Sequence, residues 1–216
     1  MKIFIDSALT SEISKCFETG LVDGVTTNPT LIKKSGRDPH DVYQELVDMG
    51  VPDISMEVPA GSYDDMHDEA MQLYTLYKEC TTVKLPMTKD GLVTCRLLSE
   101  IGVKTNVTLI FNTAQAVLAA KAGATYVSPF VGRIDDLGYA GLEVVRSIAS
   151  LYAQSGVETE VLAASIRTPH RAVRSFYNGA KYVTMPPQVF WQMYEHILTN
   201  KGLEIFELDQ RKEPIL

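Results

Sequence analysis

The stretch Thr82-Val83-Lys84-Leu85-Pro86 combines a short apolar run with one charged residue and a proline that ends the run. β-Branched residues favour a strand, and proline cannot donate the backbone hydrogen bond that the next strand residue would make. Lys84 would therefore lie at the carboxyl end of a buried strand, in the mouth of a barrel or sheet. A partly desolvated lysine loses its proton more readily and can attack a carbonyl group. The alternative is a structural lysine whose ammonium group reaches solvent at the strand end.

Seven further strand-like runs alternate with segments of helical periodicity. The eight predicted strands cover residues 2–6, 22–27, 53–58, 81–85, 103–107, 125–129, 160–165 and 181–185. The predicted helices cover residues 39–49, 63–80, 88–102, 111–122, 137–154 and 168–179. This alternation predicts an α/β fold, a single (β/α)8 TIM barrel with a closed parallel sheet. An open doubly wound sheet is the alternative, but no GxGxxG phosphate loop follows any predicted strand.

The length of 216 residues suits one barrel, so we expect a single domain over residues 1–216. Near the end of the chain, residues 203–214 alternate charged residues with a few apolar ones. We expect residues 200–216 to form a terminal helical tail that packs on the outside of the barrel or on a neighbouring subunit.

The composition narrows the class of protein. The formal net charge of −7 argues against binding to nucleic acids or anionic membranes, although a local basic pocket could still hold an anionic small substrate. The three cysteines show no CxxC spacing, which favours reduced thiols. The first residues lack the pattern of a signal peptide, and no apolar run is long enough to span a membrane. We therefore expect a cytoplasmic protein.

Polar residues stand at or just beyond the carboxyl end of nearly every predicted strand, the face where barrels of this kind carry their active sites. They are Asp6, Thr26, Asn28, Glu57, Lys84, Asn106, Thr108, Ser128, Arg133, Ser165 and Arg167. Each has a structural alternative: Asp6 and Asn28 could be turn or cap residues. Arg133 could form an ion pair with Asp135 or Asp136. Their coincidence favours one shared site for carbonyl and phosphate chemistry.

One cluster resembles a metal site. His67 stands among Asp64, Asp65, Asp68 and Glu69. Consecutive helix residues point in different directions, so these side chains would not converge on one ion. We expect a solvated helix face there and no metal.

Five motifs resemble those of the transaldolase family. In order along the chain they are Gly24-Val25-Thr26-Thr27-Asn28-Pro29-Thr30-Leu31-Ile32, Val83-Lys84-Leu85-Pro86, Asn106-Val107-Thr108-Leu109-Ile110-Phe111, Ser128-Pro129-Phe130-Val131-Gly132-Arg133 and Ala164-Ser165-Ile166-Arg167-Thr168-Pro169. The chain is similar in length to the short subfamily, which also contains fructose-6-phosphate aldolases. One departure is Asn112, where the family often has serine; it could cap the following helix.

The resemblance implies a role for each matching residue. Lys84 would form a Schiff base with the ketone carbon of the sugar phosphate, and Asp6 would move the proton of the C4 hydroxyl. Glu57 and Thr108 would move protons through a water. The resemblance further implies that Thr26, Asn28, Asn106 and Ser128 hold the three-carbon dihydroxyacetone unit beside Phe130, and that Arg133, Ser165 and Arg167 clamp the phosphate. It implies no metal and no organic cofactor.

The resemblance leaves two activities open. A transaldolase of the pentose phosphate pathway transfers a dihydroxyacetone unit from fructose 6-phosphate or sedoheptulose 7-phosphate to an aldose phosphate, either erythrose 4-phosphate or glyceraldehyde 3-phosphate. A fructose-6-phosphate aldolase releases free dihydroxyacetone. Short-subfamily aldolases typically carry Gln where this chain has Glu57 and Tyr where it has Phe130, so both residues favour the transaldolase.

Three further expectations follow. The resemblance implies a homo-oligomer, a pentamer or a decamer. A different Schiff-base lyase, such as a deoxyribose-phosphate aldolase, could share the fold, although the motifs around Asn28 and Phe130 argue against it. A catalytically silent barrel is the last alternative, and it would be expected to have lost Lys84, Asp6, Glu57 or the arginines, all of which are present.

Overall fold

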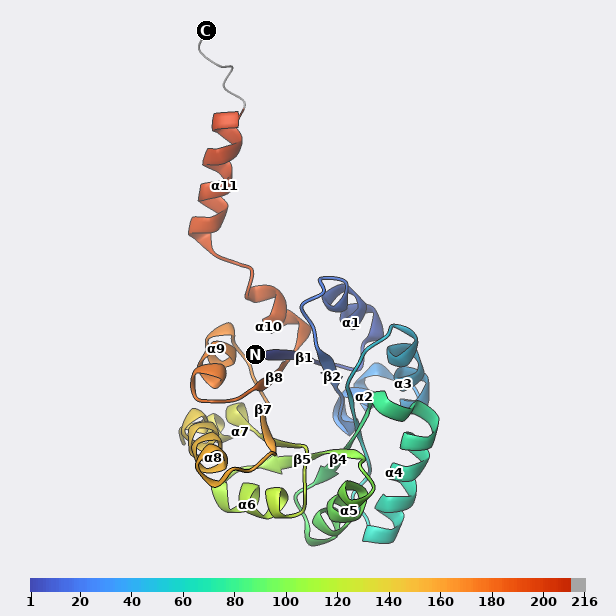
Figure 1. Ribbon diagram of the computed structural model, residues 1–216. Helices are drawn as coiled ribbons and strands as arrows, with labels where there is room; N and C mark the ends of the chain where they lie inside the picture. Colours follow the sequence, from blue (N-terminus) through green and yellow to red (C-terminus); the bar gives the residue numbers. More distant parts are fainter. Residues whose placement is uncertain (211–216) are drawn as a thin grey trace.

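Eight parallel strands close into a barrel in the order β1 to β8, and helices surround it (Figure 1). The strands are β1 (Lys2–Asp6), β2 (Gly24–Thr26), β3 (Ile54–Glu57), β4 (Thr81–Pro86), β5 (Lys104–Ile110), β6 (Tyr126–Pro129), β7 (Glu160–Ala163) and β8 (Tyr182–Met185). In this computed structural model, residues 1–210 are described, so residues 211–216 of the predicted tail lie outside the described residues. The predicted TIM barrel is confirmed, and each predicted strand overlaps an observed one.

The helices follow the strands around the barrel. They are α1 (Thr10–Phe17), α2 (Pro29–Ser35), α3 (Pro39–Asp48), α4 (Tyr63–Tyr77), α5 (Lys89–Glu100), α6 (Thr113–Lys121), α7 (Val131–Asp136), α8 (Gly141–Ser155), α9 (Pro169–Tyr177), α10 (Pro187–Gln192) and α11 (Ile197–Gln210), with a 3-10 turn η1 (Lys78–Cys80). The predicted helices lack α1, α2, α7 and α10, which are 6–8 residues long and shorter than the window over which helical periodicity is read. No described helix is both long and apolar enough to cross a membrane.

Local signals explain where several helices begin and end. The Asn112 side chain accepts a hydrogen bond from the Gln115 backbone amide at 2.9 Å, so its predicted role as the cap of α6 is confirmed. The predicted helix 63–80 was too long at its end. Lys78 has a φ of 56°, in the left-handed region, which breaks the α-helical hydrogen bonding before η1 leads into β4.

The two ends of the barrel interior differ. At the amino-terminal ends of the strands, Phe4, Tyr126, Leu162 and Tyr182 pack together and fill the interior. The Phe4 ring stands edge-on to the rings of Tyr126 and Tyr182, with centroids 6.4 and 5.7 Å apart. At the carboxyl ends the interior is lined mainly by polar side chains and holds a pocket.

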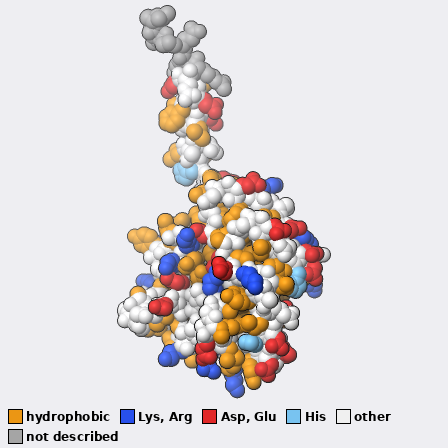
Figure 2. All heavy atoms as spheres, turned by 45° about the vertical axis from the view of Figure 1, so that its right-hand side comes forward, with side chains coloured by type: hydrophobic (Ala, Val, Ile, Leu, Met, Phe, Trp, Pro, Cys, Tyr) orange, Lys and Arg blue, Asp and Glu red, His pale blue; other side chains and the backbone are white. Residues whose placement is uncertain are grey.

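The tail is a helix, as predicted, but it does not pack on the outside of its own barrel. Helix α11 points away from the barrel in both views (Figures 1 and 2) and contains no buried residue. Its exposed apolar side chains include Ile197, Leu198, Leu203, Ile205, Phe206 and Leu208. Of the two predicted alternatives, packing on the outside of this barrel is therefore wrong for residues 197–210, and packing on a neighbouring subunit stays a prediction.

Candidate active site

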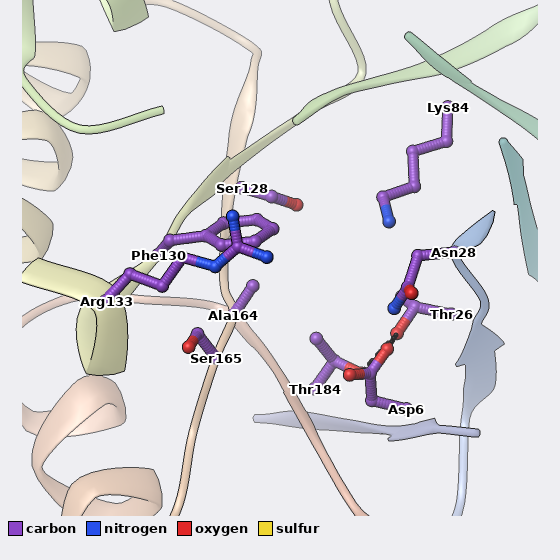
Figure 3. A pocket seen from close by; sticks show the side chains of 10 residues that line it. All are labelled: Asp6, Thr26, Asn28, Lys84, Ser128, Phe130, Arg133, Ala164, Ser165 and Thr184. Carbon is purple, nitrogen blue, oxygen red and sulfur yellow. Dashed lines mark hydrogen bonds between the residues drawn. The ribbon is translucent and has the colours of Figure 1, made fainter. Parts of the chain in front are cut away.

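A pocket opens at the carboxyl ends of the strands (Figure 3). It is lined by Asp6, Thr26, Asn28, Lys84, Ser128, Phe130, Arg133, Ala164, Ser165 and Thr184. All of these except Ala164 and Thr184 were candidates from the sequence. Lys84 and Asn28 enter from one side, and Arg133 and Ser165 from the opposite side (Figure 3). A ligand in this pocket would thus lie between an amine and a guanidinium group.

Lys84 is buried in β4, with only 4% of its surface exposed. Its Nζ lies 2.8 Å from Glu57 Oε2 and donates a hydrogen bond to the Thr27 carbonyl oxygen at 2.8 Å. Strand pairing fixes this geometry, because Glu57 of β3 is in register with Lys84 of β4. The amine therefore has, within hydrogen-bond distance, a carboxylate that can take its proton.

Asp6 faces the same pocket from β1. Its Oδ1 accepts a hydrogen bond from Thr26 Oγ1 at 2.7 Å, and Thr26 Oγ1 lies 2.7 Å from Thr184 Oγ1. Burial raises the pKa of Asp6 above its ordinary value, while the nearby Lys84 ammonium group and the Thr26 hydrogen bond act in the opposite direction. Within the described chain, no hydrogen bond occupies the second carboxylate oxygen. Asp6 can therefore accept a proton from a ligand hydroxyl.

The two candidate asparagines, Asn28 and Asn106, lie differently relative to the pocket. Asn28 Oδ1 caps α2 by accepting from the Leu31 amide at 3.0 Å, so the cap alternative holds although Asn28 also lines the pocket. Asn106 is fully buried behind the wall and does not line the pocket. Its Oδ1 accepts from Ser128 Oγ at 2.7 Å, so Asn106 orients a serine that does line it.

Thr108 of β5 is the candidate whose surroundings are least complete. Its hydroxyl is buried and has no hydrogen-bond partner among the described residues. The pairing of β5 with β6 shifts register between Val107 and Ile110, a stretch that includes Thr108, and Leu109 has a φ of 62°. A buried unpaired hydroxyl is costly unless a water or ligand completes it. Thr108 thus offers a free polar group, although it does not itself line the pocket.

The two candidate arginines differ in their surroundings. The Arg133 guanidinium lies over the Phe130 ring, 5.0 Å from its centroid, and lines the pocket. Arg167 is half-exposed, does not line the pocket and forms a two-pronged ion pair with Asp136. This guanidinium group lowers the pKa of Asp136. The alternative in which Arg133 pairs with Asp135 or Asp136 is wrong, because Asp135 pairs with Arg171 at 3.1 Å.

The loop after β7 approaches α7 closely at the arginine side. A Cβ atom at Gly132 would lie 2.3 Å from the Ser165 carbonyl oxygen and 2.9 Å from Arg167 Nε, so only glycine fits there. Ser165 itself has a φ of 57°, a strained conformation for a residue with a side chain. This close approach brings Ser165 and Arg133 to the same wall of the pocket.

Thr184 is the polar pocket residue that was not a candidate from the sequence. It stands near the carboxyl end of β8, in the predicted strand 181–185. The rule that selected the other candidates, a polar residue at the end of a barrel strand, would have selected it as well. The Thr27 carbonyl that binds Lys84 could not have been found, because backbone groups leave no sequence signal.

Within residues 1–210, no group of three or more His, Cys, Asp or Glu side chains could hold a metal ion. The ring of His67 is 3.9 Å from the carboxylate of Asp68, and both residues lie along the outer helix α4. Cys16, Cys80 and Cys95 are free thiols.

Comparison with known proteins places this geometry in context. Two solved structures share the fold at low sequence identity. Inosine 5'-monophosphate dehydrogenase from Legionella pneumophila is 13% identical with a TM-score of 0.63, and the match covers 88% of this chain and 58% of that chain. Thiamine phosphate pyrophosphorylase from Pyrococcus furiosus is 16% identical with a TM-score of 0.57, and the match covers 88% of this chain and 87% of that chain. Such low identities support the fold alone.

Sequence relatives are much closer. A protein of Caulobacter vibrioides named "Probable transaldolase" is 48% identical over 97% of this chain and 96% of its own length. A protein of Thermodesulfovibrio yellowstonii with the same name is 46% identical over 98% and 99%. The model of the family described as Transaldolase/Fructose-6-phosphate aldolase matches residues 3–214. The chain therefore belongs to the Transaldolase/Fructose-6-phosphate aldolase family.

Proposed function

We propose that this protein is a transaldolase that transfers a dihydroxyacetone unit between sugar phosphates through a Schiff base on Lys84. The donor is fructose 6-phosphate or sedoheptulose 7-phosphate, and the acceptor is erythrose 4-phosphate or glyceraldehyde 3-phosphate. The observation that carries the proposal is the buried Lys84 amine at the pocket wall, 2.8 Å from the Glu57 carboxylate. The names of the relatives support the same activity.

The first steps need a neutral amine. Proton transfer from Lys84 Nζ to Glu57 leaves a lone pair that attacks the ketone carbon and gives a carbinolamine. During the attack one N–H proton moves from the nitrogen to the former ketone oxygen. The resulting hydroxyl leaves as a molecule of water, giving the iminium ion, once Glu57 has returned its proton to that hydroxyl through a separate, bridging water. The unpaired Thr108 hydroxyl supplies a hydrogen-bonding position for this water. This assigns Glu57 and Thr108 to proton movement around Lys84.

Carbon–carbon cleavage follows from the iminium. Asp6 removes the proton of the C4 hydroxyl, the C3–C4 bond breaks, and its electron pair moves to the iminium to form an enamine. The product aldehyde leaves, and an acceptor aldehyde reverses the steps. Asn28, Thr26 and Ser128 surround the retained three-carbon unit. Asn106 acts by orienting Ser128.

Arg133 and Ser165 supply the phosphate site on the wall opposite Lys84. A guanidinium fork suits the dianion, and stacking on Phe130 holds the Arg133 plane in one orientation. Arg167 joins the clamp by exchanging its Asp136 partner for the phosphate, since a dianion attracts the guanidinium more strongly than a half-exposed carboxylate does. The phosphate is thus bound mainly by Arg133 and secondarily by Arg167.

The aldolase is the second candidate. It would protonate the enamine and release free dihydroxyacetone. The Phe130 ring lines the pocket and carries no proton, and it packs near Phe111 at a centroid distance of 5.9 Å. An apolar wall at this place favours retention of the enamine until an acceptor arrives.

The assembly is part of the proposal. Helix α11 exposes apolar side chains with no partner on its own barrel, as expected for a helix that packs against a second copy. We therefore keep the predicted pentamer or decamer, which light scattering on the full-length chain would test. The cytoplasmic location stays a prediction from the sequence.

The experiment measures glyceraldehyde 3-phosphate released from fructose 6-phosphate, with and without erythrose 4-phosphate, in a coupled NADH assay. We expect release that requires the acceptor. Equal release without acceptor would favour the aldolase. We expect the Phe130→Tyr variant to release more glyceraldehyde 3-phosphate without acceptor than the wild type does. Release of acetaldehyde from deoxyribose 5-phosphate instead would point to the other lyase. Absence of every reaction would leave a silent barrel.

A further inference from the structure

Three neighbouring strands join Thr184 to Asp6. Strand β1 pairs with β2 on one side and with β8 on the other. Asp6 is in register with Thr26, and Thr184 is in register with Phe4, two residues before Asp6 on the same face of β1. Both threonine side chains are almost fully buried, at 2% and 3% exposure. Their hydroxyl oxygens are 2.7 Å apart, and the Thr26 hydroxyl is 2.7 Å from Asp6 Oδ1 (Figure 3). The three groups form one chain of hydrogen bonds.

The number of hydroxyl protons decides which group donates each of these hydrogen bonds. A threonine hydroxyl carries one proton, and Thr26 donates its proton to the ionised Asp6 carboxylate. The bond between the two threonines therefore needs the proton of Thr184. The order is Thr184 to Thr26 to Asp6, and each donated hydrogen bond strengthens the next one.

We infer that Thr184 is a positioning residue: through Thr26 it holds the Asp6 carboxylate charged and turned so that its free oxygen faces the reacting hydroxyl. This inference rests on the proposed function, in which Asp6 removes the C4 hydroxyl proton. Thr184 lines the pocket floor but contributes through the hydrogen-bond chain, not through the substrate.

The charges around Asp6 explain why such support matters. The titratable groups that act on its carboxylate are Lys84 of β4 and Glu57 of β3, while Thr26 and Thr184 on the flanking strands are neutral. Glu12 and Lys15 of α1 border the adjoining groove and are exposed to solvent. Between the loss of the Lys84 proton and the formation of the cationic iminium, Asp6 has no positive charge on Lys84 beside it. Over that interval the hydrogen bonds help to keep Asp6 ionised.

The test compares Thr184→Val, which keeps the shape and removes the hydroxyl, with Thr184→Ser, which keeps the hydroxyl. For Thr184→Val we expect kcat to fall about 10-fold, the upper end of the range for one hydrogen bond between neutral groups. The acid limb of the kcat–pH profile should move up by about one pH unit, since a less stabilised carboxylate is protonated at higher pH. Thr184→Ser should keep the wild-type profile. Should Thr184→Val not fold, Thr184→Ala makes the same comparison.

Two controls separate this inference from the proposed function. Dihydroxyacetone with borohydride should label Lys84 equally in wild type and in Thr184→Val, because that reaction needs no C–C cleavage. In a Thr26→Val background, Thr184→Val should have no further effect on kcat. The inference, but not the proposed function, would be overturned by an equal loss of kcat in Thr184→Ser and Thr184→Val or by an unshifted kcat–pH profile in Thr184→Val. Additive effects of Thr26→Val and Thr184→Val on kcat would overturn it as well. A wild type that is neither labelled nor active would overturn it together with the proposed function.

Discussion

Two lysine–carboxylate pairs lie at opposite ends of the barrel and differ in how completely their hydrogen bonds are satisfied. At the amino-terminal end, Asp53 pairs with Lys104 at 3.3 Å and accepts from Thr82 and Tyr126 at 2.8 and 2.9 Å. Both of its oxygens are occupied, and the aromatic cluster around Phe4 fills the interior there. At the other end, Lys84 pairs with Glu57 beside an open pocket.

The pairs show that residue type does not decide function. Both ends place a lysine beside a carboxylate, but only the carboxyl end combines a buried lysine with a cavity and a free oxygen on Asp6. A buried polar group whose hydrogen bonds are all satisfied holds the side chains around it in place. A polar group with unsatisfied hydrogen bonds that faces a cavity can bind and react. Matched substitutions at the two ends should therefore differ in their effects on kcat and on stability.

The largest effect is expected from the lysines. Lys84→Ala should lower kcat at least about 10³-fold because the nucleophile is lost, as is typical when a covalent catalyst is removed. The matched variant Lys104→Ala should keep kcat within about twofold, since its loss affects only the far end. The coupled assay measures both. A strong loss of kcat in a folded Lys104→Ala protein would contradict the division between the ends.

The carboxylates should separate stability from activity. Asp53→Ala leaves Thr82, Lys104 and Tyr126 without their acceptor, so the free energy of unfolding should fall by about 2–4 kcal/mol with kcat retained. Asp6→Asn should abolish most activity. Burial raises the pKa of Asp6, so its charged form destabilises the fold and the neutral amide should not lower stability at pH 8. Urea unfolding and kcat, measured on the same samples, check both variants.

Two orphan threonines give a finer test. Thr81 and Thr108 both have buried hydroxyls without a partner in residues 1–210, one at each end of the barrel. Thr81→Val should raise the free energy of unfolding by about 1 kcal/mol, because an unpaired polar group is removed. Thr108→Val should raise it less, because the proposed relay water completes the hydrogen bonding of that hydroxyl. Only Thr108→Val should lower kcat, by about 10-fold or more. Equal kcat values for the two variants would remove Thr108 from the proposed proton path.

The smallest effect concerns an ion pair between Arg37, in the loop that joins α2 to α3, and Glu45 of α3. Arg37 binds Glu45 through two hydrogen bonds and lowers the pKa of that carboxyl to about 2. A carboxyl with a lowered pKa stabilises the fold above its unfolded pKa, and the benefit is lost as the pH falls toward 2. Arg37→Ala should therefore flatten the fall of Tm between pH 5 and pH 2, by a small amount because the pair is exposed. It should leave kcat unchanged, which makes it a control for both ends.

The sequence predicted the barrel and most of the pocket because strand ends carry a readable pattern. A polar residue directly after a buried run marks the carboxyl face, and this rule placed Asp6, Lys84 and Ser128 together. The contacts of the two arginines could not be predicted from the sequence: Asp136 binds Arg167, and Arg133 stacks on Phe130. These outcomes depend on where short elements such as α7 begin, which no periodicity shows.

We expect the lysine of the Lys84–Glu57 pair, and not that of the Lys104–Asp53 pair, to react with a ketone. The direct test is borohydride reduction in the presence of fructose 6-phosphate, followed by peptide mass mapping of every lysine. We predict a single reduced three-carbon adduct, on Lys84, with Lys104 unmodified. An adduct elsewhere, or none on Lys84 in protein that turns over substrate, would contradict the account.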